Sequence, residues 1–183
     1  TDILGMQITD EDDSRVYLRA MEERGHHCVI LQKSDKPTTV EVMGFKTFDE
    51  EDLDRAKTYF EAKGRPTAWV DRPYQGRTLL TSDNLGIPLE FYHKMDRLAP
   101  IHQNYALYRG VKPLRIDHFN CFSHDVDASV EFYSDFGFRV TEYTEDADSG
   151  KLWAAWMHRK GGVHDMAFTN GTGPRMHHVA FWV

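Results

Sequence analysis

The sequence predicts an α+β fold in which groups of short strands alternate with single helices. Most apolar segments span about four to nine residues and are rich in β-branched and aromatic side chains, which is typical of strands. Two longer segments carry apolar residues at helical spacing, and each ends at a glycine, Gly64 or Gly137. The order of strands and helix then recurs along the chain, which indicates an internal repeat.

The first half of the chain is expected to hold one complete helix among several strands. Residues 1–5 look like the end of a further helix that Gly5 stops. The segment Thr47-Phe48-Asp49-Glu50 matches the S/T-x-x-E capping box, so a helix should begin there and run to Gly64. Its apolar face would include Phe48, Leu53 and Phe60. Strands are expected at residues 6–9, 16–20, 27–32, 40–46, 67–70, 77–81 and 87–92.

The second half repeats this arrangement after a connecting segment. Residues 94–112 read as a linker with room for one short helix. The strand pattern restarts at Leu114, and Asp127 is the expected N-cap of a helix that ends at Gly137. Strands are expected at residues 114–122, 138–143, 152–158, 164–169 and 176–183.

Two short segments of the first half align with segments about 136 residues later. Residues 27–30 line up with residues 164–167, and residues 42–45 line up with residues 178–181. By this alignment the first copy lacks its opening strand and most of its first helix, and the second copy lacks its last strands. We therefore expect an N-terminal module at residues 1–95, a linker at 96–113 and the start of a C-terminal module at 114–183, in a chain truncated at both ends.

Composition and charge argue against several classes of partner. The formal net charge is −7 and no block of basic residues occurs, so we expect neither nucleic acid nor an acidic membrane as partner. No apolar run approaches the roughly 20 residues that a membrane span needs. The two cysteines, Cys28 and Cys121, do not make a disulfide framework, so we expect a cytoplasmic protein.

Histidines in two of the expected strands indicate a metal site. His118 lies in the strand at residues 114–122, and the pair at residues 177–178 lies in the last strand. Because neighbours on a strand point to opposite faces, only one histidine of the pair should face a shared site, with His177 pointing away from His178. Two histidine ligands make up half of a metal site, and a carboxylate ligand is needed to complete it.

The repeat predicts where that carboxylate lies. Glu90 sits in the last strand of the first copy, but the position there that matches His178 is Val42, which offers no ligand atom. We therefore expect Glu90 to be structural and the N-terminal module to be metal-free. The counterpart of Glu90 in the second copy would fall past Val183.

Four segments of the second half together resemble a known family. They read Leu-Arg-Ile-Asp-His-Phe-Asn at 114–120, Ala-Ala-Trp-Met-His-Arg-Lys at 154–160, Val-His-Asp at 163–165 and Gly-Pro-Arg-Met-His-His-Val-Ala-Phe at 173–181. These segments resemble the type I extradiol ring-cleaving dioxygenases, and among them the homoprotocatechuate (3,4-dihydroxyphenylacetate) 2,3-dioxygenases. The resemblance covers the whole chain. It implies the vicinal-oxygen-chelate fold of paired βαβββ modules, with metal in the C-terminal module alone.

The resemblance also implies roles for five residues. His118 and His178 would be two ligands of Fe(II), or of Mn(II) in some members, with a glutamate past the end of this sequence as the third. His164 would be the acid/base for the substrate and oxygen. Asn120, which shares a strand face with His118, would donate a hydrogen bond to bound oxygen. Trp156 would form a wall of the substrate pocket.

The implied function is cleavage of a catechol ring beside its diol by O₂. The preferred substrate is 3,4-dihydroxyphenylacetate, which gives a muconic semialdehyde. One alternative is the same chemistry on another substituted catechol. Two others are a glyoxalase-type metalloenzyme and a non-enzymatic binding protein of the same fold. The expected partners are the catechol, O₂ and further copies of the chain in a homo-oligomer such as a tetramer.

Overall fold

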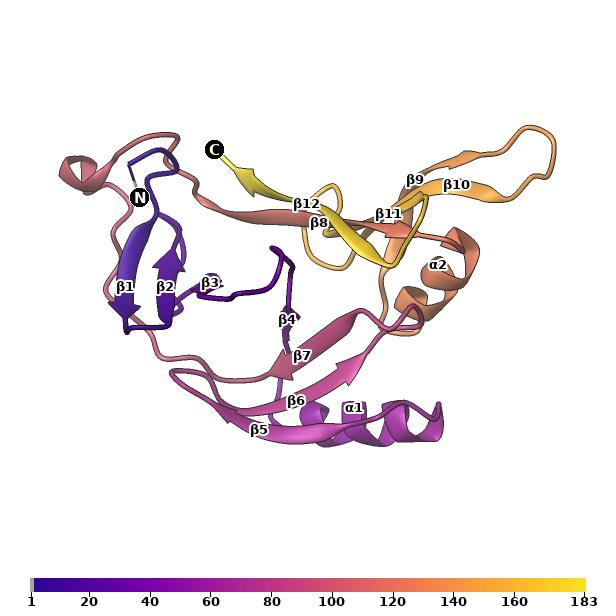
Figure 1. Ribbon diagram of the computed structural model, residues 1–183, viewed down its shortest axis with the longest axis horizontal. Coiled ribbons are helices and arrows are strands. Elements are labelled where there is room, and N and C mark those ends of the chain that lie inside the picture. The colour runs from indigo at the N-terminus through magenta and orange to yellow at the C-terminus, as the bar shows by residue number, and fades with distance from the viewer. Residues whose placement is uncertain (1) are drawn as a thin grey trace.

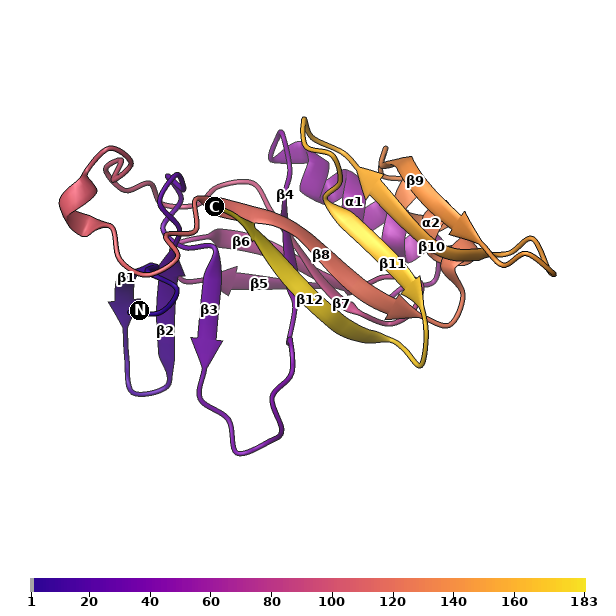
Figure 2. The ribbon, with the colours of Figure 1, turned by 90° about the horizontal axis from the view of Figure 1, so that it is seen from above.

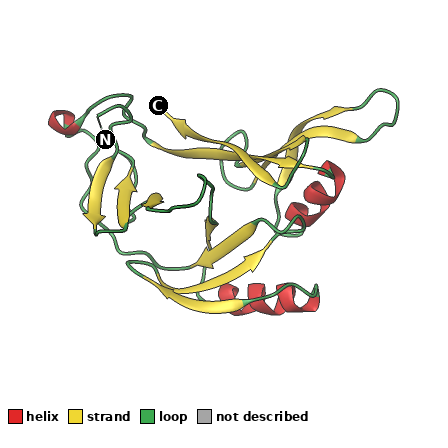
Figure 3. Cartoon of the chain, viewed as in Figure 1, coloured by secondary structure: helices red, strands yellow, loops and turns green. Residues whose placement is uncertain are grey.

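The computed structural model describes residues 2–183 and contains three β-sheets, two α-helices and one short 3₁₀ helix (Figures 1 and 3). The first sheet holds three antiparallel strands in the order β1-β2-β3. Their bounds are Gln7–Glu11, Arg15–Arg19 and Val29–Gln32.

The second sheet belongs to a strand–helix–three-strand unit with the strand order β4-β7-β6-β5. Strands β4 and β7 are parallel and the other neighbours are antiparallel. The helix covers one face of this sheet in Figure 1. The unit consists of β4 Met43–Lys46, α1 Glu51–Ala62, β5 Ala68–Arg72, β6 Gly76–Ser82 and β7 Pro88–Tyr92.

The third sheet repeats this order and adds one strand. Its order is β12-β8-β11-β10-β9, in which β8 and β11 are parallel and β12 pairs with β8 antiparallel (Figure 2). The connecting segment carries the 3₁₀ helix η1 Tyr105–Leu107. The elements are β8 Arg115–Ser123, α2 Val126–Ser134, β9 Arg139–Glu145, β10 Leu152–His158, β11 Met166–Asn170 and β12 Arg175–Trp182.

Two complete βαβββ units are therefore present, at residues 43–92 and 115–170, with the same strand order and the same parallel pair. This repeat has half the period of the one that the sequence indicated. At the longer period, β1-β2-β3 matches β9-β10-β11 as an antiparallel meander, and β4 matches β12. The fold is α+β, as the sequence predicted. The division at residues 95 and 114 stays a prediction.

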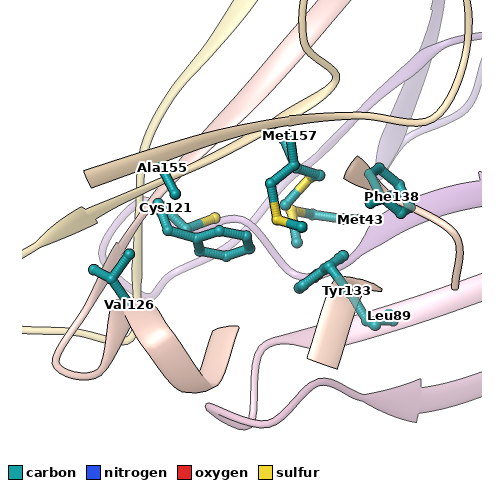
Figure 4. Close-up of a cluster of buried hydrophobic side chains, with 10 residues drawn as sticks. Met43, Leu89, Cys121, Val126, Tyr133, Phe138, Ala155 and Met157 are labelled. Carbon is teal, nitrogen blue, oxygen red and sulfur yellow. The ribbon is translucent and has the colours of Figure 1, made fainter. Parts of the chain in front are cut away.

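A single hydrophobic cluster joins the two units (Figure 4). The first unit contributes Met43 and Leu89, which are both almost fully buried. The second unit contributes Cys121, Val126, Tyr133, Phe138, Ala155, Met157, Met166 and Phe168. The buried Tyr133 hydroxyl also donates to Asp83 Oδ2 of the first unit at 3.2 Å. Because the core is shared, the position of the third sheet depends on the first unit.

Both predicted helices exist, but both predicted N-caps are wrong. Helix α1 has Glu50 as its N-cap without a side-chain cap, and Phe48 is 80% exposed. The Thr47 hydroxyl instead donates to the Asp49 carbonyl at 2.9 Å, so the capping box does not form. The N-cap of α2 is Asp125 rather than Asp127, and its carboxylate accepts from the Ala128 N–H at 3.0 Å. At the N-terminus of each helix, a side-chain hydrogen bond other than the predicted one forms, at Thr47 for α1 and at Asp125 for α2.

Smaller differences occur at the strand ends and the N-terminus. Strand β11 begins at Met166, so His164 precedes the strand in which it was expected. Residues 2–4 form a turn rather than a helical end, and Thr1 lies outside the described residues. No helix of the described residues is long and apolar enough to cross a membrane.

Candidate metal centre

The candidate site lies on one face of the five-stranded sheet. On β8, β10 and β11 the side chains of Phe119, Cys121, Ala155, Met157 and Phe168 belong to the core or pack against it. Since side chains alternate along a strand, the residues between them point to the opposite face. That face carries four of the five predicted site residues, His118, Asn120, Trp156 and His178.

Three of these residues stand in one row across the sheet. His178 on β12 lies opposite Asn120 on β8, and Asn120 lies opposite Ala167 on β11. Ala167 in turn lies opposite Trp156 on β10. The strand register thus places a histidine, an amide and an indole on one line, with a small residue between the amide and the indole. His118 is in the neighbouring row, opposite Ala180.

Two β-bulges between β8 and β12 aim the side chains at this face. Met176 pairs with Cys121 and His178 pairs with Asn120, so His177 is an extra residue on β12. Met176 therefore packs on the core while His178, two residues later, points to the other face. A regular strand would have put both on one face. The second bulge makes Asp117 the extra residue on β8.

The rings of His118 and His178 meet at their Nε2 atoms, which lie 3.0 Å apart. The other ring nitrogen of His118, Nδ1, lies 2.8 Å from Asp117 Oδ2. Burial, followed by the neighbouring His118, lowers the pKa of His178. The lowered pKa of His178 favours the neutral form that binds metal. The Asp117 carboxylate contacts His118 on the ring edge away from His178, which leaves His118 Nε2 facing the centre.

His164 completes the group from the connection between β10 and β11. Its ring centroid lies 4.1 Å from that of His118. Its Nδ1 is buried and has no hydrogen-bond partner among the described residues. Burial, followed by the neighbouring His118, lowers the pKa of His164. This imidazole is therefore neutral near pH 7 and holds a free nitrogen lone pair for a proton.

Asp165 fixes the connection that carries His164. Its Oδ2 accepts from the backbone N–H groups of Arg159 at 2.7 Å and Lys160 at 3.0 Å. Its own backbone joins two strands, because its N–H donates to the Met157 carbonyl and its carbonyl accepts from the Phe119 N–H. The residue is only 8% exposed. His164 is thus held against β8 by its neighbour in sequence.

Asn120 and Trp156 surround the histidines. Asn120 is buried, and its Oδ1 accepts from the Thr169 hydroxyl at 3.3 Å. That bond turns the amide nitrogen, a donor, toward the remaining side. Trp156 is half-buried two strands away from Asn120. It presents an apolar wall on the face where the histidines gather.

The prediction that His177 points away from His178 is wrong. Their Nδ1 atoms lie 2.6 Å apart, and the His177 ring also contacts Phe122 at 4.8 Å between centroids. The bulge at His177 breaks the alternation on which the prediction was based.

Glu90, in contrast, behaves as expected for a structural residue. It is 8% exposed, pairs with Arg72 Nε at 3.2 Å and accepts from Gln75 Nε2 at 3.1 Å.

Sequence reasoning missed Asp117 and Asp165. Both are next to a predicted site histidine, and a regular strand would point each of them away from it. Asp117, His118 and His164 have donor atoms that all lie within 4.8 Å of one another, which makes them a candidate metal-binding group. The only sequence signal for the two residues is that an acid adjoins each histidine.

The donor set fits a divalent transition metal. Ligand nitrogens at about 2.1 Å from one ion lie about 3 Å apart when they subtend a right angle, which agrees with the separation of the two Nε2 atoms. Imidazoles with a neighbouring carboxylate suit iron, manganese and related ions. His118 and His178 are thus the residues that would hold the metal.

The comparisons with known proteins agree with this site. Residues 115–183 match the model of the Glyoxalase/Bleomycin resistance protein/Dioxygenase superfamily. Over its full length the chain is 27% identical to a manganese-dependent 2,3-dihydroxybiphenyl 1,2-dioxygenase of Geobacillus genomosp. 3 and 26% identical to a metapyrocatechase of Geobacillus stearothermophilus. It spans 62% and 59% of the length of these two relatives.

Two similar solved structures are homoprotocatechuate 2,3-dioxygenases. The enzyme of Arthrobacter globiformis has a TM-score of 0.94 at 38% identity, over 99% of this chain and 56% of its own. The enzyme of Brevibacterium fuscum, in complex with 3,4-dihydroxyphenylacetate, has a TM-score of 0.94 at 40% identity, over 99% of this chain and 57% of its own. Residues 115–183 therefore resemble the glyoxalase/bleomycin resistance protein/dioxygenase superfamily, and over 99% of its length the chain is similar in fold and sequence to these two extradiol ring-cleaving dioxygenases.

Proposed function

We propose that the protein cleaves a catechol ring beside its two hydroxyl groups, with O₂ as the oxidant. The preferred substrate is 3,4-dihydroxyphenylacetate and the product is a muconic semialdehyde. The observation that carries the proposal is the meeting of the His118 and His178 Nε2 atoms at 3.0 Å, with His164 beside them on the same sheet face. Two ligands that leave open positions, next to a neutral base, suit the binding of a diol and oxygen together.

His118 and His178 would hold Fe(II), with Mn(II) as the alternative. When bound, the metal supplies Lewis acidity and a common binding point for the diol and oxygen. The preference for Fe(II) comes from the family resemblance, and the manganese-dependent relative is the reason to test both ions. A glutamate is proposed as the third ligand of the intact site.

His164 would move protons during the reaction. Its pKa is lowered, so it starts neutral and can accept a phenolic proton when the diol binds. It can then return a proton to oxygen as the ring opens. Its position 4.1 Å from the His118 ring, measured between centroids, keeps it within reach of groups bound beside that ligand.

Asn120 and Trp156 would position the reactants. Asn120 is fixed through Thr169 and offers an amide donor toward bound oxygen. Trp156 would pack against the catechol ring or its side chain, because it is the large apolar side chain in the same row. Both roles depend on the strand register rather than on a mobile loop.

The test is anaerobic titration of the full-length protein with 3,4-dihydroxyphenylacetate, catechol and 2,3-dihydroxybiphenyl, after loading with Fe(II) or Mn(II), followed by mixing with air. We expect a yellow ring-fission product, with the highest kcat/KM for 3,4-dihydroxyphenylacetate. A higher kcat/KM on another catechol would contradict the substrate assignment. Binding without ring opening would favour a binding protein, and isomerase activity without oxygen uptake would favour a glyoxalase-type enzyme.

We also propose that the protein is a cytoplasmic homo-oligomer, with a tetramer as the expected state. This proposal comes from the resemblance to the extradiol dioxygenases. Light scattering of the full-length protein after size exclusion would measure the molar mass, and a monomer would contradict it.

A further inference from the structure

Asp117 is skipped in the pairing of β8 with β12, although residues on both sides of it are paired. Ala180 pairs with His118 and Phe181 pairs with Ile116, so no residue of β12 lies opposite Asp117. The parallel ladder with β11 on the other side of β8 begins only at Phe119. Asp117 is therefore free of the alternation that a regular ladder imposes, and its side chain can turn toward its neighbour.

The carboxylate uses this freedom to reach the His118 ring. Asp117 Oδ2 lies 2.8 Å from His118 Nδ1, which is the distance of a charge-assisted hydrogen bond. An acceptor at Nδ1 places the ring proton on that nitrogen and leaves the lone pair on Nε2. The Nε2 atom is the one that faces His178. The bond thus selects the tautomer that presents a ligand atom to the centre.

The same geometry distinguishes a positioning role of Asp117 from a role as metal ligand. Its oxygen lies at the Nδ1 edge of the His118 ring, whereas the ion would lie at the Nε2 edge. Asp117 and His118 side chains are 28% and 15% exposed, so water competes little for the Nδ1 proton. We propose that Asp117 is a positioning residue, which orients His118 and fixes its tautomer for metal binding without ligating the metal itself. The inference rests on the proposed function, because it presumes that His118 is a ligand.

The test uses Asp117→Ala and Asp117→Asn in the full-length protein, with Asp148→Ala as a control in an exposed turn. Mn(II) affinity is measured anaerobically by competition with a chelator. We expect Asp117→Ala to weaken Mn(II) binding by about 10–100-fold, the usual effect of removing such a partner. Asp117→Asn keeps an oxygen acceptor and should lose less than about tenfold, and Asp148→Ala should bind like the wild type.

A second readout is independent of metal and of activity. Long-range ¹H–¹⁵N correlation spectra of the metal-free protein report which nitrogen of His118 carries the proton. We expect the Nδ1–H form in the wild type and in Asp117→Asn, and a shift toward the Nε2–H form in Asp117→Ala. Asp117→Leu, which keeps the branching at Cγ but has no acceptor oxygen, gives the same comparison where Asp117→Ala does not fold.

Three results would overturn the inference. Equal Mn(II) affinities of Asp117→Ala and Asp148→Ala, in a wild type that binds metal and cleaves catechol, would remove this inference and leave the proposed function standing. Loss of Mn(II) binding in Asp117→Asn as severe as in Asp117→Ala would make Asp117 a ligand. A wild type that binds neither Fe(II) nor Mn(II) would remove both the inference and the proposed function.

Discussion

Each histidine of the candidate metal centre is aimed by the residue next to it in sequence. Asp117 accepts from His118, the His177 ring contacts His178, and Asp165 fixes the connection before β11 that carries His164. Each neighbour lies at a bulge or a strand end, where alternation does not hold. Local departures from regular strand geometry therefore build this site, as they commonly do beside active sites.

At this scale, His164→Asn separates metal binding from chemistry. The variant should retain metal, since His164 is not an assigned ligand, and should still bind catechol. Ring cleavage should slow by about 10²–10⁴-fold, the usual cost of losing a general acid/base. Metal analysis, anaerobic catechol titration and stopped-flow mixing with O₂ on one preparation measure all three. Loss of metal would make His164 a ligand, and unchanged turnover would remove its acid/base role. The exposed His124→Asn is the matched control.

The kinds of residue at the site could be predicted from sequence, but their exact orientations could not. The segments around His118, His164 and His178 carry the resemblance, and each of these residues lies in the histidine cluster. Asp117 and His177 were misjudged because a bulge is a property of two paired strands. The register of β8 against β12 is set by contacts about 60 residues apart in sequence, which no local pattern reports.

At the scale of elements, the β10–β11 connection is a rigid support because of one carboxylate. Asp165→Ala removes the acceptor for two backbone N–H groups and should cost about 1–3 kcal/mol of unfolding free energy. Metal content should stay near the wild-type value while ring cleavage falls, because only His164 loses its support. Urea unfolding, metal analysis and turnover of Asp165→Ala and Asp148→Ala check this. Equal turnover in the two variants would contradict the support role.

The helices illustrate the same limit on sequence reasoning. Their existence followed from apolar spacing, and both are present. The first residue of each helix could not be predicted from that spacing, because several hydrogen-bond acceptors compete near each helix start. The Thr47 hydroxyl lies 2.9 Å from the Asp49 carbonyl and 3.3 Å from the Tyr92 carbonyl on β7, a contact that forms only in the folded sheet.

The N-terminal sheet is attached to the second sheet through an aromatic cluster. The His26 ring stacks on Tyr74, which follows β5, at 3.6 Å between centroids, and Tyr17 lies edge-on to both. His27 Nδ1 lies 3.2 Å from His26 Nδ1. Tyr74 also donates a hydrogen bond to Asp10 on β1. Two imidazoles in a buried contact should make this attachment sensitive to acid.

This cluster predicts a pH dependence of stability. Burial, and then the neighbouring His26, lower the pKa of His27 to about 4, against 6.5 for the free side chain. Between these values the unfolded chain binds more protons, so the unfolding free energy falls as pH drops from 6.5 toward 4. The loss is roughly 3 kcal/mol at most. Urea unfolding at several pH values should give a shallower slope for His27→Gln than for the wild type or His124→Gln. Identical slopes in all three would place the acid sensitivity elsewhere.

At the scale of the whole molecule, the two βαβββ units act as one body because they share a core. Met43 and Leu89 of the first unit belong to the same buried cluster as Tyr133 and Met157 of the second (Figure 4). The sequence predicted the α+β fold and a repeat of about 136 residues. It did not reveal the shorter repeat, because the two units share strand order rather than side chains. Topology is set by pairing and burial, which many sequences satisfy.

The two units nevertheless differ in chemistry, and this difference can be measured. Glu90 in the first unit contacts the Arg72 guanidinium and the Gln75 amide. The residue of the first half that aligns with His178 is Val42, which has no ligand atom. Glu90→Gln keeps the shape of the side chain and should leave metal content near normal. His178→Ala removes one of the two proposed ligands, so metal affinity should fall by more than about 100-fold, the upper range for residues that only support a ligand. Metal analysis of both variants in the full-length protein decides the matter. Equal loss in the two would place the metal in the first unit, while retention in both would remove His178 from the ligand set.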